Sequence, residues 1–477
     1  MPDRNARALA TRCRPLDQPV TESSQFSKST IVGSTSPPCT LDQSRRIRYI
    51  RRGGIKSAAV KFTNGGGASN GPRNVPFDRW FRYPAGFSPT ALGAALQAVA
   101  VRPGDLLIDP FVGAATGWRA GVEQGFRYAG IEAHPEIAEL AKLKVQPFAR
   151  PARIVDDAQR VAGDIVKADI SRETDLVTRS FDEDSLGELV SIRDQLKAHP
   201  HRATTRYLKW SLLGALRDCA MVQVRWPYQR PAIRRKPRIS KPARAFLRRA
   251  EWMAADLSES SPDSGATVLR GDARRLSDWG RVLGDEPADA VVTSPPYLNN
   301  FDYADATRLE LYFWGVARTW SEMVERVRAG MLTASTQQAR SAAASKSMAR
   351  VAAIAPHTAL VLGSLTNRLQ AERKRRARGK EYDRVIGPYF EGMSHVLVNM
   401  RKCLRPGARI ALVVGDSAPY GVYVDTPELL AQLAQELDLK LVDVSTIRLR
   451  GARWANNGVR HHHALTERLV VLCSPGN

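Results

Sequence analysis

The sequence has few cysteines and no long apolar run. Its five cysteines, in a chain of 477 residues, are odd in number and widely separated, so we expect reduced thiols rather than a disulfide framework or a cysteine-held metal. No apolar stretch is long enough to span a bilayer, and the first residues carry no apolar signal core. We therefore expect a cytoplasmic protein with no membrane partner.

Acidic residues are scarce relative to basic ones. The chain has 71 Lys and Arg against 48 Asp and Glu, a formal net charge of +23. A surface of this sign attracts polyanions, because a nucleic acid releases counterions when it binds. The composition indicates a nucleic-acid partner, although an arginine-rich genome leaves the same signature, and it identifies no reaction.

Composition divides the chain into a tail and a core. Residues 1–75 are rich in Ser, Thr, Gly, Pro and Arg and have few apolar clusters, which predicts a disordered basic arm. From about residue 80, short apolar strands alternate with helix-like segments, as in a parallel sheet built from βαβ units. We expect seven strands, at residues 106–108, 128–131, 267–269, 290–292, 410–414, 441–444 and 469–472.

Two long interruptions separate these strands, one after the second strand and one after the fourth. Both far exceed the usual connection in such a sheet, so we expect core regions at 76–149 and 264–477, an insert at 150–263, and a helical insert at about 300–395. The first insert ends in residues 230–249, which hold nine basic residues and no acidic one. Because prolines interrupt this run, we expect an extended basic segment that follows a phosphate backbone, and we assign target recognition to this insert.

The first predicted strand runs into Asp109-Pro-Phe-Val-Gly-Ala-Ala-Thr116. Small residues at the carboxyl end of a first strand let a ligand approach the backbone, and open parallel sheets bind nucleosides there. Glu132 follows the next strand, where an acidic side chain can accept both ribose hydroxyls of an adenosine. A strand-end surface charge is the alternative for Glu132.

The run Thr293-Ser-Pro-Pro-Tyr297 closes the fourth predicted strand. Two consecutive prolines stiffen the backbone and remove both N–H groups, which leaves the nearby carbonyls as acceptors. Ser294 adds a side-chain acceptor and Tyr297 a flat aromatic face, a combination that suits a planar base with an exocyclic amino group. A strand followed by a Pro-Pro loop, with Tyr297 in the core, is the structural alternative.

These two motifs resemble those of the DNA amino-methyltransferases, which methylate cytosine N4 or adenine N6 with S-adenosylmethionine. The resemblance covers about residues 80–145 and 265–475, with the cofactor loop before the catalytic motif. It implies an α/β fold, the Rossmann-like class I methyltransferase fold, with a seven-stranded, mostly parallel sheet and two large inserts. Ala114, Ala115 and Gly117 depart from the family loop, which has Ser, Gly and Thr there, and Ala115 weakens the match most because it replaces a glycine.

The resemblance also implies roles for individual residues. Asp272 would accept from the adenine amino group of the cofactor, and Phe87 belongs to a segment that folds over its methionine part. The expected cofactor-binding residues are Phe87, Asp109, Phe111, Gly113, Thr116, Glu132 and Asp272. The expected catalytic residues are Ser294, Pro295, Pro296 and Tyr297.

In this interpretation the target base leaves the DNA duplex and lies on Tyr297. Its NH2 group donates to Ser294 and to the Pro295 carbonyl, and no catalytic cysteine or metal is needed. The triple histidine at 461–463 lacks further ligands at suitable spacing, so we expect no metal site there.

The sequence therefore predicts an S-adenosylmethionine-dependent DNA methyltransferase that acts on cytosine N4, because Ser at position 294 accompanies that base most often in the family. A restriction, epigenetic or phage-defence setting is expected, with a cognate restriction or defence protein as a possible partner. Three alternatives stay open: the same chemistry on adenine N6, an RNA amino-methyltransferase, and a non-catalytic DNA-binding subunit.

Overall fold

The computed structural model describes residues 75–476, apart from 85, 225–229, 260–264, 339–340 and 451–462. All of these described residues belong to one compact unit. The predicted basic arm lies, except for its last position, outside the described residues.

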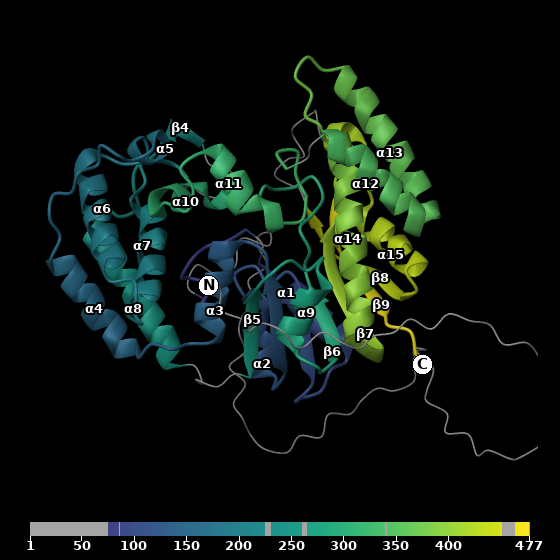
Figure 1. Ribbon diagram of the computed structural model, residues 1–477, viewed down its shortest axis with the longest axis horizontal. Coiled ribbons are helices and arrows are strands. Elements are labelled where there is room, and N and C mark those ends of the chain that lie inside the picture. The colour runs from purple at the N-terminus through teal and green to yellow at the C-terminus, as the bar shows by residue number, and fades with distance from the viewer. Residues whose placement is uncertain are drawn as a thin grey trace, which may run out of the picture. The chain divides into compact units, whose positions relative to one another are not determined.

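A seven-stranded sheet lies at the centre of this unit (Figure 1). The strand order is β5-β2-β1-β6-β7-β9-β8, and β9 is antiparallel to both of its neighbours while the pairs from β5 to β7 are parallel. All seven predicted strands are present, which confirms the mostly parallel sheet of a Rossmann-like fold. The strands are β1 (Leu106–Asp109), β2 (Arg127–Glu132), β5 (Ala266–Arg270), β6 (Ala288–Thr293), β7 (Leu404–Gly415), β8 (Lys440–Arg450) and β9 (Leu465–Cys473).

The chain reverses its direction of travel across the sheet at β1. From β1 it proceeds to β2 and β5 on one side, and it then returns to β6 on the other side. The carboxyl ends of β1 and β6 are therefore neighbours at the topological switch point, the position where open α/β sheets bind ligands. Asp109 ends β1 and Thr293 ends β6.

Side chains alternate between two hydrophobic cores, one on each face of the sheet. On β1, Leu107 packs in one core and Ile108 in the other, as the two-residue period of a strand requires. Helices α1 (Pro89–Val99), α2 (Thr116–Glu123) and α3 (Pro135–Val145) contribute to the first core. Helices α9 (Leu276–Leu283), α14 (Asp383–Cys403) and α15 (Thr426–Glu436) contribute to the second.

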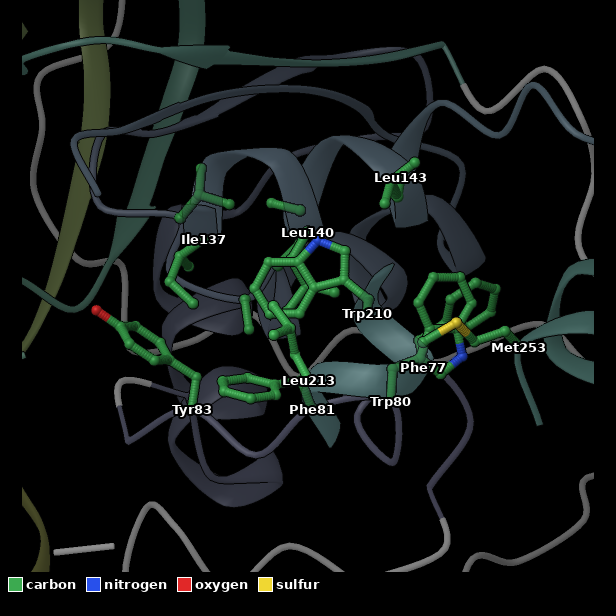
Figure 2. Packing of buried hydrophobic residues seen from close by; sticks show 14 of the residues in the cluster. Phe77, Trp80, Phe81, Tyr83, Ile137, Leu140, Leu143, Trp210, Leu213 and Met253 are labelled. Atoms are coloured by element: carbon green, nitrogen blue, oxygen red, sulfur yellow. The ribbon is translucent and has the colours of Figure 1, made fainter. Parts of the chain in front are cut away.

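The first insert is a helical layer that extends the first core. Trp80 and Trp210 are both fully buried there, and Figure 2 shows them with Leu140 of α3 and Met253. The insert therefore packs directly on α3, the helix that follows β2. Its elements are α4 (Pro151–Gly163), α5 (Asp175–Thr178), α6 (Glu183–Ala198), α7 (Thr205–Cys219), β3 (Val222–Gln223), β4 (Arg230–Arg234) and α8 (Pro242–Ser258).

The basic segment 230–249 is not extended throughout, so that prediction was wrong for residues 242–249, which begin α8. Pro242 is accommodated in the first turn of α8, where its missing N–H has no intrahelical partner to lose. Arg249 on this helix is buried and pairs with Asp218 of α7 at 2.8 Å. Part of the basic run therefore balances an internal carboxylate rather than facing a ligand.

The second insert is helical, and its last helix leads directly into β7. Glu310 of α10 accepts from Arg217 of α7 at 2.6 Å, and this buried ion pair joins the two inserts. Figure 1 shows α12 and α13 beside α14. Its helices before α14 are α10 (Arg308–Trp314), α11 (Trp320–Arg326), α12 (Ser341–Ile354) and α13 (Pro356–Lys374).

Helix length and hydropathy bear on membrane insertion. Across the part of the chain that the structure describes, no helix combines the length and the apolar character that a membrane span needs.

Candidate active site

The two sequence motifs meet through a direct hydrogen bond. The hydroxyl of Thr293 at the end of β6 donates to Asp109 Oδ1 at the end of β1, at 2.6 Å. The same oxygen accepts from the backbone N–H of Phe111 at 2.9 Å. Asp109 is buried, with 1% of its surface exposed, so this carboxyl group links the loop after β1 to the run that begins at Thr293.

The loop after β1 turns by means of two residues with positive φ. Gly113 has φ 55° and Ala115 has φ 59°. The left-handed conformation costs an alanine about 1 kcal/mol or more, because its Cβ crowds the following carbonyl. The Ala-for-Gly difference noted in the sequence therefore falls on a position where glycine is physically preferred, and the turn forms nevertheless.

Glu132 supports this loop from the end of β2. Its Oε2 accepts from the Gly113 N–H at 2.8 Å and its Oε1 accepts from the His134 N–H at 2.7 Å. Burial raises the pKa of Glu132 to about 7, although both backbone donors oppose the shift. Burial also raises the pKa of Asp109 to about 6, against the hydrogen bonds from Thr293 and Phe111.

The structure brings Phe87 and Thr116 together. The Phe87 N–H donates to Thr116 Oγ1 at 3.1 Å, and a Cβ added to Gly117 would lie 3.4 Å from the Phe87 ring. The segment before α1 therefore folds over the start of α2. The side chain of Phe111 packs instead against the second core.

Asp272 lies just beyond β5, next to the end of β2. The Gly271 N–H donates to the Glu132 carbonyl at 3.0 Å, which places the two predicted acidic residues on neighbouring strand ends. Both carboxylate oxygens of Asp272 already accept from the Arg274 guanidinium, at 2.8 and 2.7 Å. An adenine amino group would have to share this carboxylate with Arg274, a partner that the sequence interpretation did not include.

Ser294 follows β6 and lies against β7. Its hydroxyl donates to the Val413 carbonyl of β7 at 3.0 Å, and its Oγ lies 3.4 Å from the Tyr297 hydroxyl oxygen. Because the Ser294 proton is directed to Val413, the oxygen lone pairs remain as acceptors. Pro295 is buried and Pro296 is half-buried.

Tyr297 is buried and held at both its hydroxyl and its ring, which differs from the open stacking face expected from the sequence. The hydroxyl donates to Glu467 Oε1 of β9 at 2.7 Å, and only 8% of the residue is exposed. The Arg450 guanidinium lies over the ring, 4.8 Å from its centroid. Burial and the Glu467 carboxylate raise the pKa of Tyr297 well above its ordinary value, so the phenol stays protonated.

Glu467, Arg448 and Arg450 are neighbours of the site that the sequence interpretation missed. Burial favours the neutral form of Glu467, yet Arg448, which donates to both oxygens at 2.5 and 3.0 Å, holds the pKa of Glu467 below its ordinary value. The signal available in the sequence was a single acidic residue inside the apolar strand β9. It could not show which residue Glu467 contacts.

We assign no role in this site to three further groups of polar or reactive side chains: Asp416, Cys219 and the histidines at 461–463. Asp416 is buried and accepts from the Thr466 N–H and hydroxyl and from the Tyr423 hydroxyl. Cys219 is a buried thiol whose pKa burial raises to about 12. His461 and His462 lie outside the described residues, and among the residues described no cluster of His, Cys, Asp and Glu is suited to a metal ion.

Comparison with known proteins finds a methyltransferase that is similar in sequence to this chain. The type II methyltransferase M.BsoBI of Geobacillus stearothermophilus is 22% identical over 421 residues, which cover 79% of this chain and 81% of that protein. This likeness supports a methyltransferase family. No family model matches the chain.

A search of solved structures returned a further methyltransferase, the rRNA methyltransferase AviRa of Streptomyces viridochromogenes. The alignment has 11% identity and a TM-score of 0.25, over 82% of this chain and 88% of that one. A superposition this loose carries no argument about the site.

Proposed function

We propose that this protein transfers a methyl group from S-adenosylmethionine to the exocyclic N4 amine of cytosine in DNA. The observation that carries the proposal is the 2.6 Å hydrogen bond between Thr293 and Asp109, because it sets the Pro-Pro corner directly beside the loop at the switch point of the sheet. The net charge of +23 supports a nucleic-acid substrate. A cytoplasmic, restriction or defence setting follows from the same proposal.

The residues around the loop suit this cofactor. Glu132 keeps lone pairs after accepting two backbone N–H groups, so it can still accept ribose hydroxyls. Phe87 lies over the Thr116 turn, where it would cover the methionine part. The proposed cofactor-binding set is Phe87, Asp109, Phe111, Gly113, Thr116, Glu132 and Asp272. When bound, S-adenosylmethionine supplies an electrophilic methyl group on a sulfonium centre.

The catalytic residues would act on the target amine. The lone pair of an exocyclic amine is delocalised into its ring, and hydrogen bonds from the NH2 group to Ser294 Oγ and the Pro295 carbonyl draw the nitrogen toward tetrahedral geometry. The nitrogen held in this way would attack the methyl carbon as the carbon–sulfur bond breaks with its electron pair to sulfur, and the methylated amine would lose a proton to water. Alignment and fixed acceptors would supply most of the rate, with Pro295 and Pro296 fixing the corner.

Arg450 covers one face of the Tyr297 ring and would limit access of a base to that face. A base that stacks on the face of Tyr297 now covered by Arg450 requires the guanidinium to move, since a 4.8 Å separation leaves no room for a ring between them. Extrusion of the target base from the duplex therefore includes a local exchange of Arg450 for the base.

The test is the identity of the methylated nucleoside. Purified protein is incubated with tritium-labelled cofactor and unmethylated plasmid DNA, the DNA is hydrolysed, and the labelled nucleoside is identified by chromatography. Label on N4-methyl-2′-deoxycytidine supports the proposal, and label on N6-methyl-2′-deoxyadenosine moves the assignment to adenine. Absence of label from the DNA would reject DNA methylation by this chain, and a parallel incubation with RNA that alone takes up label would move the assignment to an RNA amino-methyltransferase.

A further inference from the structure

A fully buried lysine lies beneath the proposed cofactor loop and has no role in the chemistry described above. Lys144, near the end of α3, has 0% of its surface exposed. Its Nζ donates to the Ala114 carbonyl at 2.7 Å. Burial lowers the pKa of Lys144 to about 8, which shows how costly an ammonium group is at this place.

The neighbouring carboxylates do not explain the lysine. Asp78 and Asp256 both favour its charged form, but no ion pair within 4.0 Å joins Lys144 to an acidic side chain in the described part of the chain. Asp256 is occupied by the Phe77 N–H and the Trp80 indole, each at 2.7 Å. The Ala114 carbonyl is therefore the direct partner of Lys144.

That carbonyl controls the turn at the next residue. The C=O of Ala114 and the N–H of Ala115 belong to one rigid peptide plane, so fixing the carbonyl restricts φ of Ala115. The other side of the plane is also held, because the Ala115 N–H donates to the Val112 carbonyl at 3.0 Å. Ala115 has φ 59°, a conformation that glycine adopts without cost and alanine does not.

We infer that Lys144 is a positioning residue for the cofactor loop, whose hydrogen bond to Ala114 holds Ala115 in the left-handed turn that a glycine would adopt unaided. The inference rests on the proposed function for its effect on cofactor binding. Its effect on the loop itself does not depend on that function.

The experiment compares four proteins with the wild type: Lys144→Met, Ala115→Gly, the double variant, and Lys142→Met. Lys142 lies on the same helix and is exposed, so it controls for loss of a lysine from α3. Hydrogen exchange of the free proteins is measured over residues 110–118, and affinity for S-adenosylhomocysteine is measured by calorimetry.

We expect Lys144→Met to speed hydrogen exchange in residues 110–118 and to weaken ligand binding by about tenfold. This factor corresponds to the free-energy cost of keeping an alanine in the left-handed conformation without the lysine hydrogen bond. Ala115→Gly should restore both properties in the double variant, and Lys142→Met should change neither. A general packing defect would not be repaired by the glycine, so exchange and affinity that stay altered in the double variant would overturn the inference.

Unchanged exchange in Lys144→Met would overturn it as well. If Lys144→Met does not fold, the comparison is made with Lys144→Gln, alone and with Ala115→Gly, under the same two criteria. A wild-type protein that binds no ligand would reject the proposed function, while the exchange data would still decide the role of Lys144.

Discussion

At the scale of single residues, two buried carboxyl groups of the candidate site have pKa values above the ordinary range of Asp and Glu. Burial raises the pKa of Asp109 to about 6 and that of Glu132 to about 7. Both residues lie at strand ends beside the cofactor loop. Ligands that donate hydrogen bonds to such groups bind best when the groups are ionised.

Cofactor affinity should therefore rise with pH up to about 7. Below the pKa of Glu132, binding must remove a proton from its carboxyl group, so affinity should fall by up to tenfold for each pH unit. Above that pKa, affinity should be constant. Calorimetry with S-adenosylhomocysteine between about pH 6 and 8 measures the slope. Glu132→Gln should bind weakly with no slope in this range, and an unaltered slope in that variant would assign the titration to another group.

Tyr297 and Glu467 should be energetically coupled, because the phenol donates to a buried carboxylate at 2.7 Å. Such a bond contributes about 1.5–3 kcal/mol. Urea unfolding gives the free energy of unfolding of Tyr297→Phe, Glu467→Gln and the double variant. The loss in the double variant should differ from the sum of the two single losses by about 1 kcal/mol or more. Additive changes would show that Glu467 does not hold the tyrosine.

The sequence predicted some of these residues and not others, for a physical reason. Asp109 and Ser294 follow apolar strands, and the carboxyl ends of neighbouring parallel strands meet at one edge, so their proximity could be predicted. Glu467 and Arg450 reach Tyr297 through the antiparallel pairing of β8 with β9, whose register cannot be read from either strand alone. The burial of Tyr297, which the sequence offered only as the alternative to an open stacking face, depends on the same pairing.

At the scale of elements, the basic run at 230–249 contains both a buried, paired arginine and exposed ones. The prolines in this run argue against a continuous helix and predict an extended segment, yet Pro242 begins α8. Arg238, Arg248 and Arg249 converge on the buried Asp218 of α7, at 3.1, 3.4 and 2.8 Å. Long-range pairing of this kind cannot be predicted from local composition.

Arg249 and Arg244, on the same helix, should therefore behave differently. Arg249→Gln removes a buried partner of Asp218 and should lower the free energy of unfolding by about 2–3 kcal/mol, since the other two arginines still share the charge. Arg244 is exposed, so Arg244→Gln should leave stability within about 0.5 kcal/mol. If Arg244 contacts phosphate, its loss should reduce the slope of log K against log salt for DNA binding by about 0.9. An equal loss of stability in both variants would contradict this division, and an unchanged slope would remove Arg244 from the interface.

At the scale of the whole molecule, the candidate site lies at the ends of two sheet strands, β1 and β6, and the inserts pack around the sheet. Seven strands with correct spacing could be predicted because each is a short apolar run between polar turns. The packing of the first insert on α3, through residues such as Trp210, could not be predicted. The sequence shows which face of each helix is apolar, but it does not show which two faces pack together. Assignment of target recognition to residues 150–263 stays a prediction.

In the proposed function, Ser294 and the loop at Asp109 form one methyl-transfer site. The most direct measurement is single-turnover transfer of labelled methyl to DNA by wild-type protein and Ser294→Ala, with cofactor affinity measured for both. We predict that Ser294→Ala binds the cofactor within about twofold of wild type and transfers methyl at least about 100-fold more slowly, the scale of losing one fixed catalytic hydrogen bond. Transfer by Ser294→Ala at the wild-type rate would contradict the account.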